Sequence, residues 1–158
     1  MKKVAVFVDV QNVYYTVKQA YKRNFNYNEF WSEISQLGEV VKAYAYAIDR
    51  GDRKQEEFQN ILRAIGFEVK LKPYIQRSDG SAKGDWDVGI TLDVMDVSDS
   101  VDIVILVSGD GDFDLLVDRV KNKKNKIVKV YGVPQLTASS LMNAASVYEP
   151  INEKLLMN

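Results

Sequence analysis

The sequence of 158 residues contains neither cysteine nor histidine. Without cysteine, the chain has no disulfide, no thiolate metal site and no cysteine nucleophile. Without histidine, it cannot build a Ser-His-Asp or Cys-His arrangement, and a structural zinc site lacks its usual ligands. A metal site in this chain must therefore be built from oxygen ligands, which favours Mg²⁺, Mn²⁺ or Ca²⁺.

Long hydrophobic runs are also missing. The N-terminal sequence MKKVAVFVDVQN has about six apolar residues before Asp9, too few for a signal peptide. No segment approaches the ~20 apolar residues that a membrane-spanning helix needs. We therefore expect a cytoplasmic protein with no membrane partner. The length predicts a single domain over residues 1–158, which buries about 70% of the surface of its unfolded chain.

The net charge of −1 conceals a segregation of charges along the chain. Residues 85–118 contain ten aspartates and no Lys or Arg, whereas residues 119–129 contain six basic residues and no acid. The basic segment is able to bind a phosphate backbone, but basic side chains also favour the C-terminus of a helix. This segment lies at the opposite end of its helix from Asp112. We therefore expect it to face away from the acidic residues.

Short apolar runs alternate with helical patterns. Strands are expected at residues 4–8, 40–48, 67–71, 101–107, 127–131 and 147–151. Helices are expected to begin at Asn12, Asn28, Asp52, Asp85 or Asp87, Asp112 and Thr137. The alternation predicts an α/β fold with a mainly parallel sheet, helices on both faces and ligands at the carboxyl ends of the strands.

Finer features of these elements also follow from the pattern. Gly38 and Gly66 are expected to end the second and third helices. The apolar positions of the third helix predict a buried face, made by Phe58, Ile61, Leu62 and Ile65. Residues 76–84, QRSDGSAKG, are polar with two glycines and are expected to form a loop.

The stretch LVSGDGDFDLL places Asp110, Asp112 and Asp114 between a strand and a helix. One aspartate suffices to cap a helix, and Asp114 in the first turn is explained as a surface acid that stabilises the helix dipole. Asp110 and Asp112 remain as candidate ligands. Glycines at 109 and 111 are expected to let the backbone turn and a ligand approach. An EF-hand calcium loop is excluded because its downstream glycine and glutamate are missing.

Two further acids complete the candidate set. Asp9 follows the first strand, which is expected to lie beside strand 101–107, and Asp87 opens the helix in KGDWDVGITLD. Asp93 lies about 240° further around that helix and is assigned a supporting hydrogen bond or a place in solvent. The remaining acids are assigned to caps and surface: Asp85, Asp96, Asp99 and Asp102. Trp86 is assigned to packing in the core or at the rim in preference to base stacking.

Three or four carboxylates that converge without histidine have a direct chemical use. They hold one or two divalent cations, which activate water and stabilise the leaving oxygen in phosphodiester cleavage. Mg²⁺ suits such a site because it is hard, prefers oxygen and keeps several waters.

Taken together, VFVDVQNVYY, KGDWDVGITLDV and LVSGDGDFDLLV resemble the NYN family, a branch of the PIN-like nucleases. The resemblance covers about residues 4–150 and includes YGVPQLTASSLMNAASVY near the end. It implies a Rossmann-like, three-layer α/β sandwich with a mainly parallel central sheet, and RNA cleavage that depends on Mg²⁺ or Mn²⁺.

The resemblance also implies roles for individual residues. The acidic cluster of the family falls on four aspartates, proposed as catalytic residues and metal ligands: Asp9, Asp87, Asp110 and Asp112. Its helix-start asparagine falls on Asn12, its small polar residue on Ser108, and its Lys-Gly pair on Lys83 and Gly84. Of these, Asn12, Ser108 and Lys83 are expected to bind substrate. One departure is visible, since family members often carry an Ala-Asp pair where this chain has Ala145 and Ser146.

Further substrate contacts are expected from loops at the same sheet edge. Arg50, Arg53, Arg77 and Lys83 are candidates for binding phosphate. Tyr14 and Tyr15 follow the first motif and are candidates for base stacking, with at least one of them expected in the core.

Three functions remain open on the sequence. The first is an endoribonuclease that uses Mg²⁺ or Mn²⁺ and acts on single-stranded RNA. The second is a catalytically silent member of the family that binds RNA or a protein and acts in regulation. The third is a phosphatase or phosphoryl-accepting domain with Asp9 as nucleophile, disfavoured because position 11 is Gln and not a second acid. A monomer and a homodimer are both compatible with the sequence.

Overall fold

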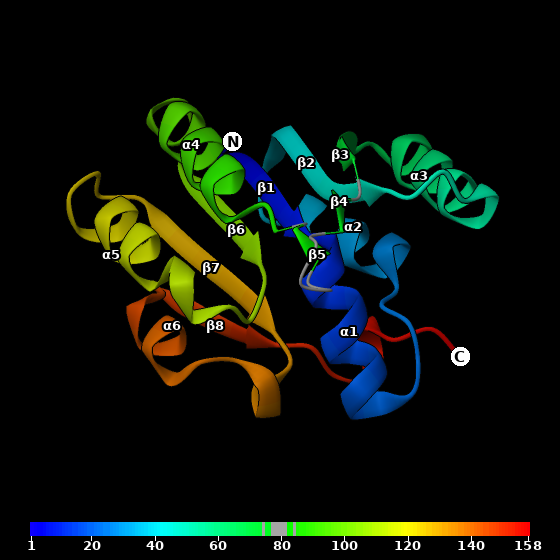
Figure 1. Ribbon diagram of the computed structural model, residues 1–158. Helices are drawn as coiled ribbons and strands as arrows, with labels where there is room; N and C mark the ends of the chain where they lie inside the picture. Colours follow the sequence, from blue (N-terminus) through cyan, green and yellow to red (C-terminus); the bar gives the residue numbers. More distant parts are fainter. Residues whose placement is uncertain (74, 77–81, 84) are drawn as a thin grey trace.

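A six-stranded sheet forms the centre of the protein. The computed structural model describes residues 1–73, 75–76, 82–83 and 85–158. All six strands are parallel and lie in the order β3-β2-β1-β6-β7-β8 (Figure 1). Their bounds are β1 Lys3–Asp9, β2 Glu39–Asp49, β3 Glu68–Pro73, β6 Ile103–Val107, β7 Ile127–Gly132 and β8 Val147–Pro150. The predicted parallel α/β sheet is confirmed.

Helices cover both faces of this sheet and make the other two layers. One face packs against α1 (Val10–Tyr21), α2 (Tyr27–Ser35) and α3 (Arg53–Ile65). The other face packs against α4 (Asp87–Val97), α5 (Asp114–Asn122) and α6 (Ser139–Ala144). Within the described residues, no helix is both long enough and apolar enough to cross a membrane.

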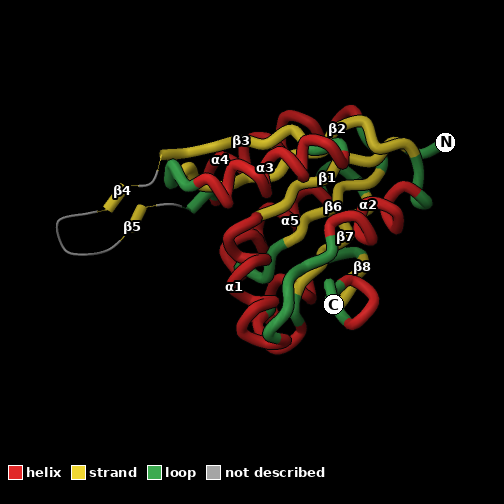
Figure 2. The backbone as a smooth tube through the Cα atoms, turned by 90° about the vertical axis from the view of Figure 1, so that its right-hand side faces the viewer, coloured by secondary structure: helices red, strands yellow, loops and turns green. Residues whose placement is uncertain are grey.

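Two short strands lie outside the central sheet. β4 (Ile75–Gln76) pairs antiparallel with β5 (Ala82–Lys83), and the pair projects from one end of the molecule (Figure 2). The loop predicted at residues 76–84 therefore contains parts of both strands. Its positions 77–81 and 84 lie outside the described residues.

The strand order reverses at β1. From β1 the chain moves outward through β2 and β3, and it then returns to the other side of β1 to place β6, β7 and β8. β1 pairs with β6 over five residues, from Val4 opposite Ile103 to Val8 opposite Val107. A ligand of such a sheet binds outside the carboxyl ends of the strands where the order reverses. This geometry directs attention to the residues directly after Val8 and Val107.

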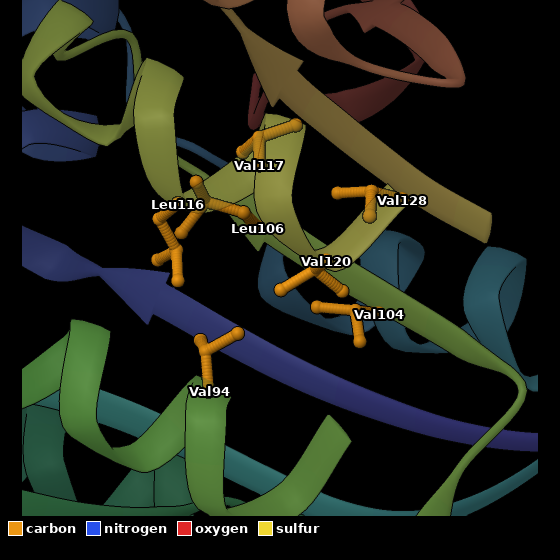
Figure 3. A pocket seen from close by; sticks show the side chains of 7 residues that line it. All are labelled: Val94, Val104, Leu106, Leu116, Val117, Val120 and Val128. Carbon is orange, nitrogen blue, oxygen red and sulfur yellow. The ribbon is translucent and has the colours of Figure 1, made fainter. Parts of the chain in front are cut away.

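The apolar core explains why the two central strands are continuous runs. Residues 4–8 and 103–107 are all buried, because helices cover both of their faces. Between α4, α5 and the sheet, the packing leaves a void of only about 10 Å³ (Figure 3). A void this small and apolar is no ligand site.

Helix starts differ from the predictions at four places. α5 begins at Asp114, after the 3-10 turn Gly111–Phe113, and not at Asp112. α2 is capped by Asn26, whose Oδ1 accepts a hydrogen bond from the Glu29 N–H, and not by Asn28. α1 begins at Val10, directly after β1, so Asn12 lies in its first turn. Thr137 does not cap α6, because its hydroxyl donates a hydrogen bond to the Val133 carbonyl.

The predicted end of the third helix is confirmed, whereas the predicted end of the second helix is wrong. Asp52 caps α3 and Gly66 ends it with a φ of 140°, both as predicted. α2 ends at Ser35, before Gly38. Gly38 instead lies where a Cβ atom would meet the Lys2 carbonyl oxygen. Ile61 was expected in the buried face of α3, but its side chain is 54% exposed.

Two leucines that differ in burial allow a prediction about stability. Leu106 in β6 is 1% exposed, and Leu115 in α5 is 80% exposed. We expect Leu106→Ala to lower the free energy of unfolding by about 2–5 kcal/mol, because it removes buried methyl groups and opens a cavity. Leu115→Ala is the matched control, with a change below about 0.5 kcal/mol. Urea denaturation measures both, and equal losses would contradict the assigned burial.

Candidate metal centre

Four predicted acids lie at the place where the strand order reverses. Asp9 is the last residue of β1, and Asp110 and Asp112 follow β6, where residues Gly111–Phe113 form a 3-10 turn. Asp87 is the first residue of α4, on the helix layer that covers β1 and β6. Carboxylate oxygens of Asp87, Asp110 and Asp112 lie within 4.8 Å of one another. Segments far apart in the sequence thus contribute to one acidic cluster.

A chain of hydrogen bonds connects Asp9 to this cluster. The Ser108 hydroxyl donates to Asp9 Oδ2 at 3.2 Å and accepts from the Asp110 N–H at 3.2 Å. Asp110 Oδ1 then accepts from the Asp112 N–H at 2.9 Å. Asp110 therefore caps the turn, as one interpretation of the sequence proposed, and it also belongs to the acidic cluster. Asp9 itself is buried behind the cluster and is not one of its three mutually close carboxylates.

Asn12 holds the loop after β6 from the side of α1. Its side-chain oxygen accepts a hydrogen bond from the Gly109 N–H at 2.9 Å. Asn12 thus contacts Gly109, and Ser108 contacts Asp9 and the Asp110 N–H. These hydrogen bonds restrain the loop, and a role of Asn12 and Ser108 in substrate binding stays a prediction.

Burial and neighbouring acids raise the pKa of Asp9. Loss of solvation is the main cause, and hydrogen bonds from the Asn12 backbone and the Ser108 hydroxyl oppose it. The carboxylates of Asp110 and Asp85 add repulsion, and the pKa of Asp9 is about 6. This carboxyl therefore changes its charge near neutral pH.

The pKa of Asp87 is raised further, to about 7. Partial burial is the first cause, followed by repulsion from Asp110, Asp85 and Asp9. A hydrogen bond with Asp110 also favours the protonated form. Like charges that share a site cannot all ionise freely, and a cation between them removes this cost. The acidic cluster is thus electrostatically unfavourable by itself.

Both glycines of the SGDGD stretch face another part of the chain. A Cβ atom at Gly109 would lie 2.8 Å from the Leu136 carbonyl oxygen, and one at Gly111 would lie 2.8 Å from Ala138 Cβ. The Ala138 N–H also donates to the Gly109 carbonyl at 3.1 Å. The expectation that these glycines make room for a ligand is therefore wrong. They allow residues 136–138 to pack closely against the acidic turn.

The other aspartates lie where the sequence placed them. Asp114 opens α5 and is not part of the acidic cluster. Asp93 accepts hydrogen bonds from the Tyr46 hydroxyl and from Lys70 Nζ, both at 2.7 Å. Asp85 accepts from the Asp87 N–H at 3.3 Å. Each acid has the capping, supporting or surface role assigned to it.

The predicted basic contacts are placed less completely. Arg50 directly follows β2, at the carboxyl edge of the sheet, and Arg53 opens α3. Lys83 ends the short strand β5. Arg77 and Gly84 lie outside the described residues. A role of these side chains in substrate binding stays a prediction.

Two basic residues have positions that the sequence interpretation missed. Arg119 was expected to face away from the acids, yet it lines a surface depression of about 340 Å³ together with Asp112, Thr91, Met95, Leu115 and Leu116. Helical side chains lean toward the N-terminus, which brings Arg119 back toward the acidic turn. Lys72 Nζ donates to the Asp85 carbonyl at 3.1 Å and lies 4.5 Å from the centre of the Trp86 ring.

Trp86 packs at the rim of the sheet, as predicted. Its Nε1 donates a hydrogen bond to the Ala47 carbonyl at 2.8 Å, and its ring contacts Tyr46.

The departure at Ala145 and Ser146 lies away from the acidic cluster. The Ser146 hydroxyl accepts a hydrogen bond from the Val128 N–H at 2.9 Å, near the start of β7. Asp110 follows the opposite end of the neighbouring strand, β6. The missing carboxylate at position 146 therefore does not remove a member of the acidic cluster.

The raised pKa of Asp87 predicts the sign of a pH effect on stability. A carboxyl with a folded-state pKa of about 7, against an ordinary aspartate value of 3.8, destabilises the folded chain increasingly as pH rises from about 4 to 7. Without divalent cations, we expect Asp87→Asn to melt at a higher temperature than the wild type at pH 8, and this difference to shrink toward pH 4.

Circular dichroism melts in EDTA measure this effect. The control is Asp96→Asn, which removes an exposed carboxylate from the same helix. A stabilisation by Asp87→Asn that is the same at pH 4 and pH 8 would contradict the assigned repulsion.

Comparison with known proteins agrees with this architecture. The chain is 58% identical to a Vibrio parahaemolyticus protein of unknown function whose crystal structure superposes with a TM-score of 0.94, covering 99% of this chain and 96% of that one. Ribokinase from Giardia lamblia has a TM-score of 0.51 at 12% identity over 97% of this chain and 58% of that chain, a likeness of fold alone.

A match to a family model identifies the family. The chain is 27% identical to the low amplitude and bright protein LabA of Synechococcus elongatus, over 96% of this chain and 84% of LabA. The family model of the NYN domain matches residues 3–152, nearly the whole chain. The protein therefore belongs to the NYN domain family, whose members are generally nuclease-like.

Proposed function

We propose that the protein is a metal-dependent ribonuclease that cleaves phosphodiester bonds of RNA. The observation that carries this proposal is the convergence of Asp87, Asp110 and Asp112 within 4.8 Å at the carboxyl edge of the parallel sheet. Asp9 lies behind them, linked through Ser108. Membership of the NYN domain family supports the same chemistry.

The donor set fits a hard divalent cation. It consists of carboxylates, since the chain has no histidine or cysteine, and Mg²⁺ and Mn²⁺ accept such ligands. The repulsion that raises the pKa of Asp87 is relieved by a positive charge. Asp87, Asp110 and Asp112 would hold the ion, with Asp9 as the fourth acid of the site. A bound ion would supply activation of water and stabilisation of the leaving oxygen.

Ser108 and Asn12 fix the acidic residues in place. Ser108 connects the Asp9 carboxylate to the Asp110 backbone, and Asn12 restrains Gly109. A site held by neighbours in this way keeps its geometry when a substrate binds. Asn12 and Ser108 are therefore positioning residues in this proposal.

The substrate in this proposal is single-stranded RNA. The acidic cluster repels the phosphates of RNA, so binding of RNA needs basic side chains around the cluster. Arg50 at the end of β2 and Lys83 on β5 are proposed as phosphate contacts, together with Arg77. A catalytically silent domain that binds RNA or a protein in a regulatory role is the alternative, and RNA binding without cleavage would favour it.

A matched pair of aspartates from one stretch tests catalysis. We expect Asp110→Asn to lower the rate of cleavage of labelled single-stranded RNA by ~100-fold or more in Mg²⁺ or Mn²⁺, because it weakens the ion site directly. Asp114→Asn, outside the acidic cluster, should cleave like the wild type. Cleavage that persists in EDTA, or equal rates for wild type and Asp110→Asn, would refute the proposal.

Metal binding should also stabilise the fold. An ion at a hundredfold excess over its dissociation constant adds about 2.7 kcal/mol, or roughly 5–10 °C for a chain of this size. We expect Mn²⁺ to raise the melting temperature of the wild type and of Asp114→Asn, but much less that of Asp110→Asn. Differential scanning fluorimetry with a Mn²⁺ titration measures this shift. Equal shifts in all three proteins would show that the ion binds elsewhere.

A further inference from the structure

The outer face of α1 carries two adjacent exposed tyrosines. The side chains of Tyr14 and Tyr15 are 51% and 52% exposed, and their ring centres lie 5.4 Å apart in an edge-to-face arrangement. The expectation that at least one of them belongs to the core is therefore wrong. The core side of the helix is made by Val10, Val13 and Val17. The two rings are thus available to a ligand.

The same face is positively charged. Residues 10–22 contain two lysines and no acid, and both Lys18 and Lys22 are exposed. At about 100° per residue, Tyr14, Tyr15 and Lys18 lie within an arc of about 100° around the helix, and Lys22 follows directly after its last turn, in the left-handed conformation. We call these four residues the tyrosine–lysine face. Aromatic rings among cations form the combination that binds single-stranded nucleic acids.

This face begins beside the acidic cluster. α1 starts directly after Asp9, and Asn12 contacts Gly109 in the loop that carries Asp110. Tyr15 lies three residues after Asn12, so the two side chains are neighbours on the helix surface. Figure 2 places α1 at the end of the molecule from which β4 and β5 project. An RNA strand that runs from the acidic cluster past Asn12 reaches Tyr15 first.

We propose that the tyrosine–lysine face binds single-stranded RNA next to the acidic cluster, with bases stacked on Tyr14 and Tyr15 and phosphates near Lys18 and Lys22. This inference rests on the proposed ribonuclease function and names the part of the substrate path that selects unpaired RNA. Bases in a duplex are stacked on each other and offer no free ring face, so the face discriminates against double-stranded RNA.

Binding measured without cleavage tests the proposal. Fluorescence anisotropy with a fluorescein-labelled single-stranded RNA in EDTA compares the wild type with Tyr14→Ala/Tyr15→Ala and Tyr14→Phe/Tyr15→Phe. We expect the alanine variant to bind about 10- to 100-fold more weakly, and the phenylalanine variant to bind like the wild type because it keeps the rings. Lys18→Gln/Lys22→Gln should reduce the slope of log affinity against log salt by about 1.4.

Two controls make the result specific. Ile61→Ala removes a comparably exposed apolar side chain from α3, since Ile61 is 54% exposed, and should leave RNA binding unchanged. Binding of a double-stranded RNA should be the same for wild type and alanine variant. A wild type that binds no single-stranded RNA, or an alanine variant that binds it like the wild type, would overturn the proposal. So would a phenylalanine variant as weak as the alanine variant.

The outcomes separate this proposal from the ribonuclease proposal. A wild type that binds through the tyrosine–lysine face but cleaves no RNA in Mg²⁺ or Mn²⁺ refutes the ribonuclease and supports the face. A wild type that cleaves RNA while the alanine variant binds normally refutes the face and supports the ribonuclease.

Discussion

Parallel pairing of β1 with β6 is the constraint on which the candidate site depends. It places Val8 opposite Val107, so that the residues after both strands emerge side by side. Asp9 and Ser108 then meet through a hydrogen bond, although 99 residues separate them in the chain. Because both strands are buried on both faces, a shift in their register would disturb the whole core. The energy of the apolar core therefore fixes the position of polar side chains at its edge.

That scaffold holds together charges that would otherwise separate. Burial and neighbouring carboxylates raise the pKa values of Asp9 and Asp87 to about 6 and 7. Such a cluster persists only where the surrounding structure fixes its members, and functional sites are where proteins accept this cost. Ser108 is hydrogen-bonded to the Asp9 carboxylate and to the Asp110 N–H, and Asn12 is hydrogen-bonded to the Gly109 N–H. These bonds restrain the residues that carry the acids. A cation bound among these carboxylates would relieve their repulsion.

Much of the fold follows from local sequence. The runs at residues 4–8 and 103–107 identify central strands because only a strand covered on both faces is apolar throughout. Asp9 and Asp110 could be placed at one edge because parallel strands share their carboxyl ends, and Asp87 because it opens a helix that covers these strands. Caps were harder to predict, since Asn26 and Asn28 offer the same chemistry two residues apart.

The features that escaped prediction depend on distant contacts. The role of Gly109 depends on its contact with Leu136, which lies in a turn after β7. No local sequence pattern predicts that contact. Arg119 lines the same surface depression as Asp112, whereas its position in the sequence suggested the opposite end of the helix. The exposure of Tyr14 and Tyr15 likewise follows from which side of α1 the sheet occupies. Local sequence predicts elements and their order, and tertiary packing decides what each side chain contacts.

The close packing of residues 136–138 against Gly109 and Gly111 has a consequence for synthesis of the chain. All four acids have been translated by residue 112, but the segment that braces their turn comes more than twenty residues later. A nascent chain whose exposed part ends at β6 and its following turn carries the carboxylates without this support. The acidic turn can therefore take its final shape only after residues 136–138 have been translated.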